Sequence, residues 1–243
     1  MISFIVPAHN EELLLEGTLQ ALHAAAREAQ VEYEVIVVDD ASTDATARIG
    51  ARLATRVLPV TCRQIAAARN AGAQAAAGDI LFFVDADTWA TGTAVRSALE
   101  ALTAGAVGGG CLFRFDGFVP LWARIVYPFF IAAARLLRIV GGCFLFCRRD
   151  AFHAVGGFDE RYFAAEKVQF LKSLKRQGRV VIPRPLVVTS GRKLRTWTGL
   201  QIAATLVKFA WRGPRTYTSR DGLEIWYGQR PPDPEVLRPA EPR

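Results

Sequence analysis

The sequence predicts a mostly parallel, doubly wound α/β sheet followed by a smaller region. In the first half of the chain, short apolar segments alternate with segments whose apolar residues recur at helical spacing. The apolar segments are continuous, which is typical of strands covered on both faces of a sheet. Several of them end in acidic residues, and open parallel sheets bind ligands at the carboxyl ends of their strands. With 243 residues, 51% of them hydrophobic, the chain can bury one large core.

The elements of the first half follow from these patterns in order. The first helix carries Leu15, Leu19 and Leu22 at helical spacing and acidic residues in its first turn. Ser42 or Thr43 can cap a second helix that runs through Arg52. The expected strands are 2–6, stopped by a proline, then 34–38, 57–60 and 80–84. The first helix is expected over 11–29 and the third over 63–77.

Beyond residue 88 the pattern is less regular. A strand over 106–115 is interrupted by three glycines at 108–110, which predict a bulge or the close approach of a ligand. Proline and charge dominate from residue 227, and such a composition predicts a disordered tail. We therefore expect one domain over 1–220, with halves 1–116 and 117–220, and a tail over 221–243. The remaining expected strands are 144–146, 180–182 and 186–188, and the remaining helices are 92–103, 149–155, 166–177 and 196–211.

The most apolar region is 118–147. Arg124, Arg135 and Arg138 interrupt it, so its longest charge-free run, 125–134, is too short to span a bilayer, which needs roughly 20 residues. One interpretation is an interfacial helix with the arginines at the level of the lipid head groups and aromatic anchors at Trp122, Tyr127, Phe129 and Phe130. The other is a helix packed in the core or in a dimer, which leaves an oligomer open.

Charge is distributed unevenly along the chain. Residues 1–116 hold 14 acidic and 8 basic side chains, whereas 167–220 hold 13 basic and no acidic ones. Such a basic segment suits phosphate groups, on a ligand or on anionic lipids, and no nucleic-acid-binding motif accompanies it. The four cysteines have neither zinc-site spacing nor the density of a disulfide framework. Together with the absence of a signal-peptide pattern, this predicts a cytoplasmic protein, peripheral on the inner membrane face if the apolar helix is interfacial.

Two carboxylates, Asp85 and Asp87, leave the buried strand 80–84 together. In extended backbone, residues two apart project to the same side, so these side chains could share one target. Carboxylate oxygens bind hard divalent cations, and a cation offsets the charge that a leaving diphosphate accumulates. We therefore predict a Mn²⁺ or Mg²⁺ site at Asp85 and Asp87, and the alternative is a pair of caps for the helix that begins near Thr91.

Acidic residues also follow the first two strands. Glu11 lies just beyond the first strand, and Asp39 and Asp40 end the second, so all three converge on the same edge of the sheet. They are candidates for ligand binding, and the alternative is ordinary capping of the helices that follow. Arg69, on the helix before the strand 80–84, is either another ligand contact or a surface residue.

Four blocks of sequence together resemble the family 2 glycosyltransferases, and the resemblance covers about residues 2–195. The blocks are FIVPAHNEE at 4–12, VVDDASTD at 37–44, ARNAGAQAAAGDILFFVDADT at 68–88 and GGFDERYFAAEKVQFLKSLKRQG at 156–178. The resemblance implies a GT-A fold, a nucleotide-diphosphate-sugar donor, a divalent cation and inverting transfer. It also implies that 1–116 is the half that binds the nucleotide sugar and that 117–220 is the acceptor side.

The resemblance assigns roles to residues of this chain. It implies that Asp40 and Glu11, with Asp39 as the alternative to Asp40, bind the base and ribose. Arg69 would approach the diphosphate or sugar, and Gly72 would allow close packing of its helix on the sheet. The segment 187–196 resembles one that closes over the diphosphate, with Arg192 and Arg195 as its basic residues. The other expected donor contacts are Pro7, Asn10, Val38, Asp85 and Ala86, and the expected catalytic residues are Asp87, through the metal, and Glu166.

One departure from the family pattern concerns the general base. Many members have Glu-Asp where this chain has Glu166-Lys167, and the second acidic residue usually removes the proton of the acceptor hydroxyl. A protonated lysine cannot do so, and we therefore predict that Glu166 is the base. The basic segment 167–220 and the apolar region 118–147 suit a lipid-linked acceptor at a membrane surface. The alternatives to an active transferase are a binding or scaffold protein that lost the base and, less well supported, a sugar nucleotidyltransferase.

Overall fold

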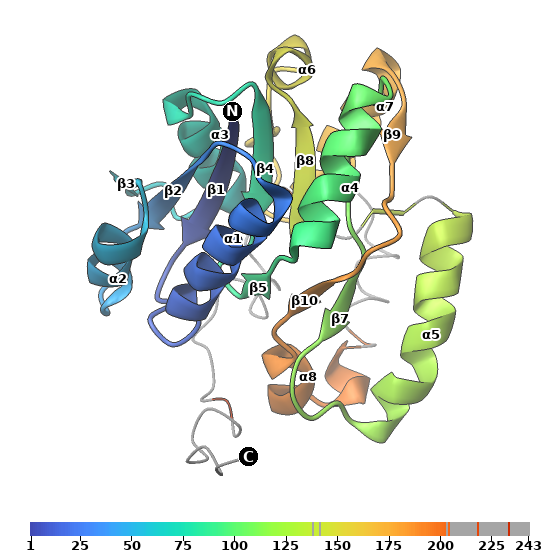
Figure 1. Ribbon diagram of the computed structural model, residues 1–243. Coiled ribbons are helices and arrows are strands. Elements are labelled where there is room, and N and C mark those ends of the chain that lie inside the picture. Colours follow the sequence, from blue (N-terminus) through green and yellow to red (C-terminus); the bar gives the residue numbers. More distant parts are fainter. Residues whose placement is uncertain (138, 141, 203, 205–217, 219–232, 234–243) are drawn as a thin grey trace.

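The computed structural model of this chain describes residues 1–137, 139–140, 142–202, 204, 218 and 233. It has three layers, a central sheet between two groups of helices, with a small second sheet at one end (Figure 1). The predicted α/β fold with a mostly parallel sheet is therefore confirmed. Within the described residues, no helix is long and apolar enough to cross a membrane.

The central sheet has seven strands in the order β3-β2-β1-β4-β8-β6-β9. The first four strands are parallel, and β8 runs antiparallel to both of its neighbours. β4 is buried throughout its last four residues, which explains why its sequence is apolar without alternation. The bounds are β1 Ile2–Ala8, β2 Tyr33–Asp40, β3 Arg56–Val60, β4 Ile80–Val84, β6 Gly108–Gly110, β8 Phe144–Arg148 and β9 Val180–Val181.

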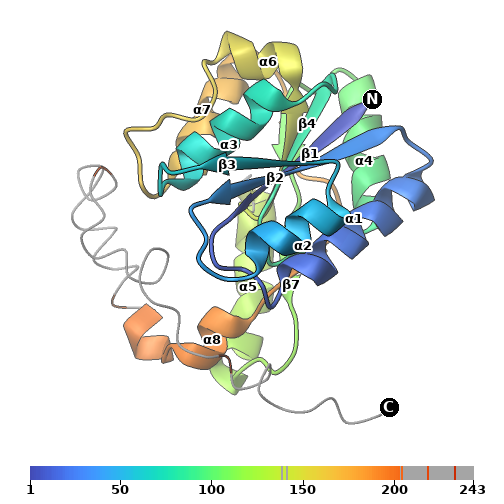
Figure 2. The same ribbon diagram turned by 90° about the vertical axis from the view of Figure 1, so that its left-hand side faces the viewer.

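The helices cover both faces of the sheet, and each face has its own hydrophobic cluster. One face carries α1 (Leu15–Ala29), α2 (Thr46–Leu53) and α4 (Gly92–Thr103), and the other carries α3 (Ile65–Ala75), α6 (Arg149–Ala154) and α7 (Glu166–Gln177) (Figure 2). Adjacent residues of β4 serve opposite faces. Phe82 packs with Phe4 and Phe144, whereas Phe83 packs with Phe152, Phe158 and Phe170.

Gly72 brings α3 close to the sheet, as predicted. A Cβ at this position would overlap the side chain of Ile5 and lie 2.8 Å from Cγ2 of Val38. Only a residue without a side chain lets the helix backbone approach these two strand residues so closely. The close packing fixes the position of α3 and therefore that of Arg69, one turn earlier on the same helix.

The predicted strand 106–115 divides between the two sheets. Gly108–Gly110 form β6 of the central sheet, and Phe113–Phe115 form β7 of the small sheet, whose order is β5-β10-β7. The glycines accommodate neighbouring strands rather than a ligand, because a Cβ at Gly108 or Gly110 would lie 2.7 or 2.8 Å from a carbonyl oxygen of β8. The other two strands of the small sheet are β5 (Thr88–Trp89) and β10 (Val187–Thr189).

Several predicted boundaries move. β1 continues through Pro7 to Ala8, and α1 begins at Leu15 rather than at residue 11, because residues 9–14 form a loop. The apolar region contains α5 (Leu121–Leu136), and α8 (Arg192–Thr196) follows the small sheet. Half of the predicted helix 196–211 and most of the tail 221–243 lie outside the described residues, as does Arg138.

Candidate functional site

The loops that follow β1, β2 and β4 meet at the carboxyl edge of the central sheet. Asn10, just after β1, accepts a hydrogen bond from the backbone N–H of Thr43 at 2.8 Å. The backbone N–H of Glu11 donates to Thr46 Oγ1 at 2.8 Å. These bonds join the first loop to the second, so the acidic ends of β1 and β2 lie side by side as the sequence predicts.

Asp85 and Asp87 lie at this edge but do not continue the strand. β4 ends at Val84, and the backbone N–H of Thr88 donates to the carbonyl of Asp85 at 3.0 Å, which closes a turn. The expectation of extended backbone after the strand is therefore wrong, and a target shared by the two carboxylates stays a prediction. The turn directs each carboxylate to a different arginine.

Arg69 bridges Asp85 and Glu166. Its Nη2 lies 2.7 Å from Asp85 Oδ1, and its Nη1 lies 2.7 Å from Glu166 Oε1. The arginine is 1% exposed and Glu166 is 4% exposed, so this is a buried ion pair rather than the surface position that was the alternative for Arg69. Burial alone would raise the pKa of Asp85, but the Arg69 guanidinium and the Lys167 ammonium outweigh it and hold the pKa below its usual value.

Arg192, at the start of α8, makes the equivalent bridge to Asp87. Its guanidinium contacts both oxygens of Glu11 at 2.8 and 2.9 Å and Asp87 Oδ2 at 2.7 Å. Burial raises the pKa of Asp87, and Arg192 offsets this only in part because its charge is shared with Glu11. A residue from late in the chain thus joins the loops after β1 and β4.

Two lysines that were not predicted as site residues complete the cluster. Lys167 and Lys193 both stabilise the charged form of Asp85, and the charge of Lys167 also acts on Lys193. Burial, together with the neighbouring charges of Lys167 and Arg192, lowers the pKa of Lys193, although Asp87 opposes the shift. Gly142 leaves space for the Lys167 side chain, since a Cβ there would overlap it. The RKLR sequence at 192–195 was a signal for Lys193, but only its arginines were named.

Four carboxylates and four cations therefore meet at this site, which we call the charged cluster. Its members are Glu11, Asp85, Asp87, Glu166, Arg69, Lys167, Arg192 and Lys193. Because the charges balance, a strongly anionic ligand is accommodated best together with a cation, or by displacing one of the ion pairs.

The aspartates of the cluster can hold a divalent cation only with other ligands. Each uses one oxygen for its arginine, and among the described residues the other oxygen, Asp85 Oδ2 or Asp87 Oδ1, makes no hydrogen bond. Their side chains are 33% and 14% exposed. No three His, Cys, Asp or Glu residues of the described part of the chain form a metal-binding group. The donor set fits a Mn²⁺ or Mg²⁺ ion whose remaining ligands are water and diphosphate oxygens.

Asp39 and Asp40 differ in the hydrogen bonds that their carboxylate oxygens accept. Asp40 accepts hydrogen bonds from the backbone N–H groups of Arg63 at 2.7 Å and Gln64 at 2.9 Å, which fixes the loop before α3. Asp39 is 8% exposed, and its Oδ1 is buried with no hydrogen-bond partner in the described structure. A buried carboxylate oxygen without a partner is costly, which makes Asp39 the better ligand-binding candidate.

Backbone strain is concentrated around the same edge. Asn10, Ala41, Arg63 and Ala165 have positive φ angles of 51°, 54°, 49° and 60°. Each follows a strand end or precedes a helix whose residues take part in the site. Side-chain-bearing residues persist in this conformation only where the surroundings enforce it, and such positions are typical of functional sites.

Other predicted site residues have structural contacts instead. Arg195 binds Asp116 and Asp233. Val38 is buried against α3, and the carbonyl of Ala86 accepts a hydrogen bond from Thr18 Oγ1 at 2.8 Å. Pro7 lies within β1. The roles of these residues in donor binding stay predictions.

Asn70 provides a connection that the sequence did not reveal. Its Nδ2 donates to the carbonyl of Phe158 and to Glu160 Oε1, both at 2.8 Å, and its Oδ1 accepts from the N–H of Phe158 at 2.8 Å. It therefore holds the segment before α7 against α3. This attachment brings Glu166 and Lys167 to the cluster.

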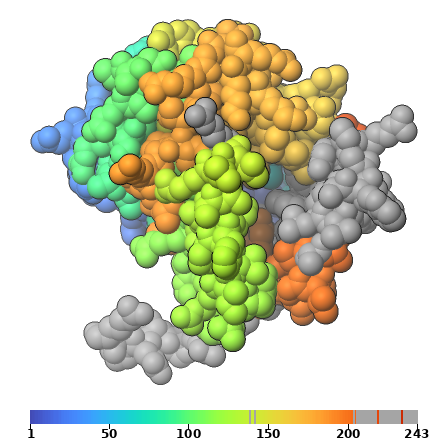
Figure 3. Space-filling view, turned by 90° about the vertical axis from the view of Figure 1, so that its right-hand side faces the viewer, coloured from blue at the N-terminus to red at the C-terminus, as the bar shows by residue number. Residues whose placement is uncertain are grey.

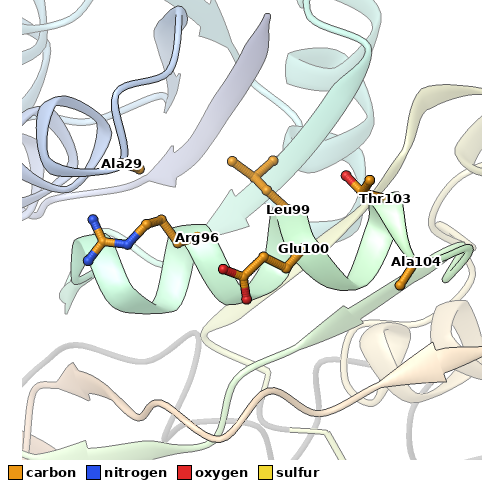
Figure 4. A pocket seen from close by; sticks show the side chains of 6 residues that line it. All are labelled: Ala29, Arg96, Leu99, Glu100, Thr103 and Ala104. Carbon is orange, nitrogen blue, oxygen red and sulfur yellow. The ribbon is translucent and has the colours of Figure 1, made fainter.

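A shallow pocket of about 480 Å³ lies elsewhere, between the end of α1 and α4 (Figure 4). Its lining residues are Ala29, Arg96, Leu99, Glu100, Thr103 and Ala104. Arg96 is already paired with Glu28 at 2.9 Å, and the pocket contains none of the charged cluster. We assign no function to it.

The sequence pattern of the family described as "Glycosyl transferase family 2" matches residues 3–156. This chain belongs to that family. The match includes the loops after β1, β2 and β4 but ends before Glu166 and Lys167. The resemblance noted in the sequence is thereby confirmed over residues 3–156.

The chain matches only part of the length of its named relatives. The chain is 33% identical over 125 residues to validoxylamine A glucosyltransferase of Streptomyces hygroscopicus subsp. limoneus, matching 48% of this chain and 27% of the relative. It is 34% identical over 93 residues to undecaprenyl-phosphate 4-deoxy-4-formamido-L-arabinose transferase of Pseudomonas fluorescens, matching 35% and 27%. The matches thus span about a quarter of these enzymes.

Solved structures confirm the GT-A fold. The mannosyltransferase PcManGT from Pyrobaculum calidifontis, in complex with GDP-Man and Mn²⁺, superposes with a TM-score of 0.66 at 24% identity, covering 93% of this chain and 68% of that one. S. aureus TarS in complex with UDP-GlcNAc gives a TM-score of 0.61 at 20% identity, covering 79% and 58%.

Proposed function

We propose that this protein transfers a sugar from a nucleotide-diphosphate sugar to an acceptor oxygen, with a divalent cation at Asp85 and Asp87. The observation that carries the proposal is the turn after β4, where each aspartate has one oxygen without a hydrogen bond to the described residues, beside two arginines and two lysines. A bound cation would supply Lewis-acid stabilisation of the diphosphate. Arg69, Arg192 and Lys193 would balance the charge of the leaving group, since cations near a diphosphate stabilise the charge that develops there.

Donor recognition is proposed for the loops after β1 and β2. The unpaired Oδ1 of Asp39 can accept a hydrogen bond from a base N–H or a ribose hydroxyl, which would satisfy it. Glu11 is engaged with Arg192, and its contribution would be to hold that arginine in place. In the transfer itself, the acceptor oxygen bonds to the anomeric carbon as the bond to the diphosphate breaks, so a single displacement inverts the configuration.

For the acceptor, we propose an oxygen that is already ionised, such as that of a lipid phosphate. Glu166, the predicted general base, is 4% exposed and its Oε1 is held by Arg69, so an acceptor hydroxyl has little access to it. The neighbouring Lys167 would attract an anionic acceptor, and a phosphate oxygen needs no base. The undecaprenyl-phosphate transferase among the relatives acts on such a group by its name. Glu166 acting as base on a hydroxyl is the second candidate, favoured by its position at the start of α7.

The donor proposal is tested by following nucleotide release. The protein is incubated with UDP-, GDP- and dTDP-sugars and undecaprenyl phosphate, with Mn²⁺ or with a chelator. We expect release of a nucleoside diphosphate from one class of donor, and we expect the chelator to abolish it. Pyrophosphate exchange would indicate a nucleotidyltransferase, and thermal stabilisation without turnover would indicate a binding protein.

The acceptor proposal is tested with Glu166→Gln and Lys167→Met. We expect Glu166→Gln to change kcat by less than about tenfold, whereas loss of a general base costs about 10²–10⁴-fold. Lys167→Met is expected to raise the KM for the phosphate acceptor by about ten- to a hundredfold, because one charge-assisted contact of about 1.5–3 kcal/mol is lost. A fall of kcat by two or more orders of magnitude in Glu166→Gln, with donor binding intact, would establish Glu166 as the base instead.

A further inference from the structure

The outer face of α5 is apolar, although α5 lies on the surface of the protein. Figure 3 shows the helix as a ridge that runs down the middle of one face of the molecule. Within α5, only Ala123 and Ala134 are buried. Beyond these, the helix contacts β7 through Tyr127 and Phe130, which pack against Phe113. The side of α5 that packs against the protein is thus narrow, and most of the helix surface is exposed.

The exposed side chains of α5 form one continuous surface, which we call the α5 face. Leu121 is 70% exposed, Ile125 57%, Phe129 72% and Leu136 83%. These positions are spaced by four, four and seven residues, so they follow one side of a helix with 3.6 residues per turn. Phe118, Trp122 and Val126 extend the surface and are also exposed. Soluble proteins rarely leave this many large apolar side chains together in water, and such patches mark binding surfaces.

The charges around the α5 face indicate the chemistry of its partner. Arg124 and Arg135 lie eleven residues apart, three helical turns, so both border the apolar surface on the same side. Both are exposed, and there is no acidic residue in the sequence between Asp116 and Asp150. An apolar strip with a basic margin, on a helix without an acidic residue of its own, matches an anionic lipid surface, where side chains such as Phe129 enter the acyl region and the arginines reach the phosphates.

We propose that the α5 face is a membrane-binding surface, and that α5 lies in the plane of a bilayer containing anionic lipids. The contact of Tyr127 with Phe115 of β7 holds the inner side of α5 against the protein, so the α5 face points outward. The small sheet connects this surface to the charged cluster, because β7 pairs with β10, and Ser190 after β10 donates its backbone N–H to the carbonyl of Asp87 at 2.9 Å. The proposal concerns lipid binding and is independent of the proposed transfer activity.

Vesicle binding tests the proposal with the full chain. Vesicles of phosphatidylcholine alone, and of phosphatidylcholine mixed equally with phosphatidylglycerol, are sedimented with the protein. We expect binding to the mixed vesicles and weaker binding to the neutral ones. Ile125→Glu with Phe129→Glu should lower the partition coefficient at least about tenfold, and Arg124→Glu about fivefold or more on the anionic vesicles only. The control Val168→Glu changes an exposed apolar residue of α7 and should leave binding unaltered.

A second measurement keeps the test decisive if the glutamate variants fold poorly. Brominated lipids should quench tryptophan fluorescence of the wild-type protein, and Trp122→Phe should remove most of that quenching. The proposal is overturned if the wild-type protein fails to bind anionic vesicles. It is equally overturned if light scattering shows a dimer that Phe129→Glu dissociates while vesicle binding stays the same, since the α5 face would then be covered by a second copy.

Discussion

Replacing Asp87 by asparagine is expected to lower the kcat/KM of sugar transfer by at least about a hundredfold. The asparagine keeps the shape of the side chain but loses the charge that would hold a divalent cation and that binds Arg192 at 2.7 Å. The concentration of Mn²⁺ needed for half-maximal activity should rise together with the loss of rate. Initial rates of nucleoside diphosphate release, measured across a Mn²⁺ titration, check both expectations.

Asp79→Asn is the matched control for Asp87→Asn. Asp79 lies just before β4, whereas Asp87 lies beyond its end, and the Asp79 side chain is 89% exposed. Its removal changes the net charge by the same amount without touching the charged cluster, so transfer should be unaltered. If Asp87→Asn retained wild-type transfer and the same Mn²⁺ dependence, the cation site at the turn after β4 would be wrong.

The sequence was sufficient to predict the central sheet because its strands and helices have local signals. The continuous apolar run at 80–84 predicted a strand buried on both faces, and helix 166–177 was predicted with the bounds observed for α7. The glycines at 108–110 were recognised as unusual, but their reason is contact with neighbouring strands, which no local pattern contains. The elements of the second half were therefore harder to predict, because their positions depend on contacts between residues that lie far apart in the sequence.

The residues of the site were predicted better than their contacts. Glu11, Asp85, Asp87, Arg69, Glu166 and Arg192 were all named, and the structure brings them together. Which acid pairs with which arginine depends on the turn after β4 and on the distance in sequence between Arg192 and Glu11, so it could not be read from spacing. The choice between Asp39 and Asp40 likewise depends on the Arg63 and Gln64 N–H groups, which lie on a loop that comes later in the chain.

Removing Arg69 should cost more stability than any single surface change. Arg69→Met leaves the buried Glu166 and the partly exposed Asp85 without the cation that they share, and breaking a buried ion pair such as Arg69–Glu166 typically costs about 3–5 kcal/mol. We expect a loss of that size in the free energy of unfolding, measured by urea denaturation at pH 7. Arg161→Met, in which an 81% exposed arginine loses its pairing with Asp159, is the matched control and should change stability little.

The pH dependence of this loss distinguishes an electrostatic cause from a packing defect. The folded-state pKa of Asp85 lies below its ordinary value of 3.8, so its ionised form stabilises the fold above that pH, and the contribution is lost as the pH falls through the lower folded-state pKa. The difference in stability between the wild-type protein and Arg69→Met should therefore shrink as the pH is lowered below about 3.8. Adding Glu166→Gln to Arg69→Met should recover part of the loss at pH 7, because one buried charge without a partner is removed. A cavity left by the arginine side chain would produce neither effect, so a difference that stays constant with pH and is not reduced in the double variant would show that Arg69 acts by packing alone.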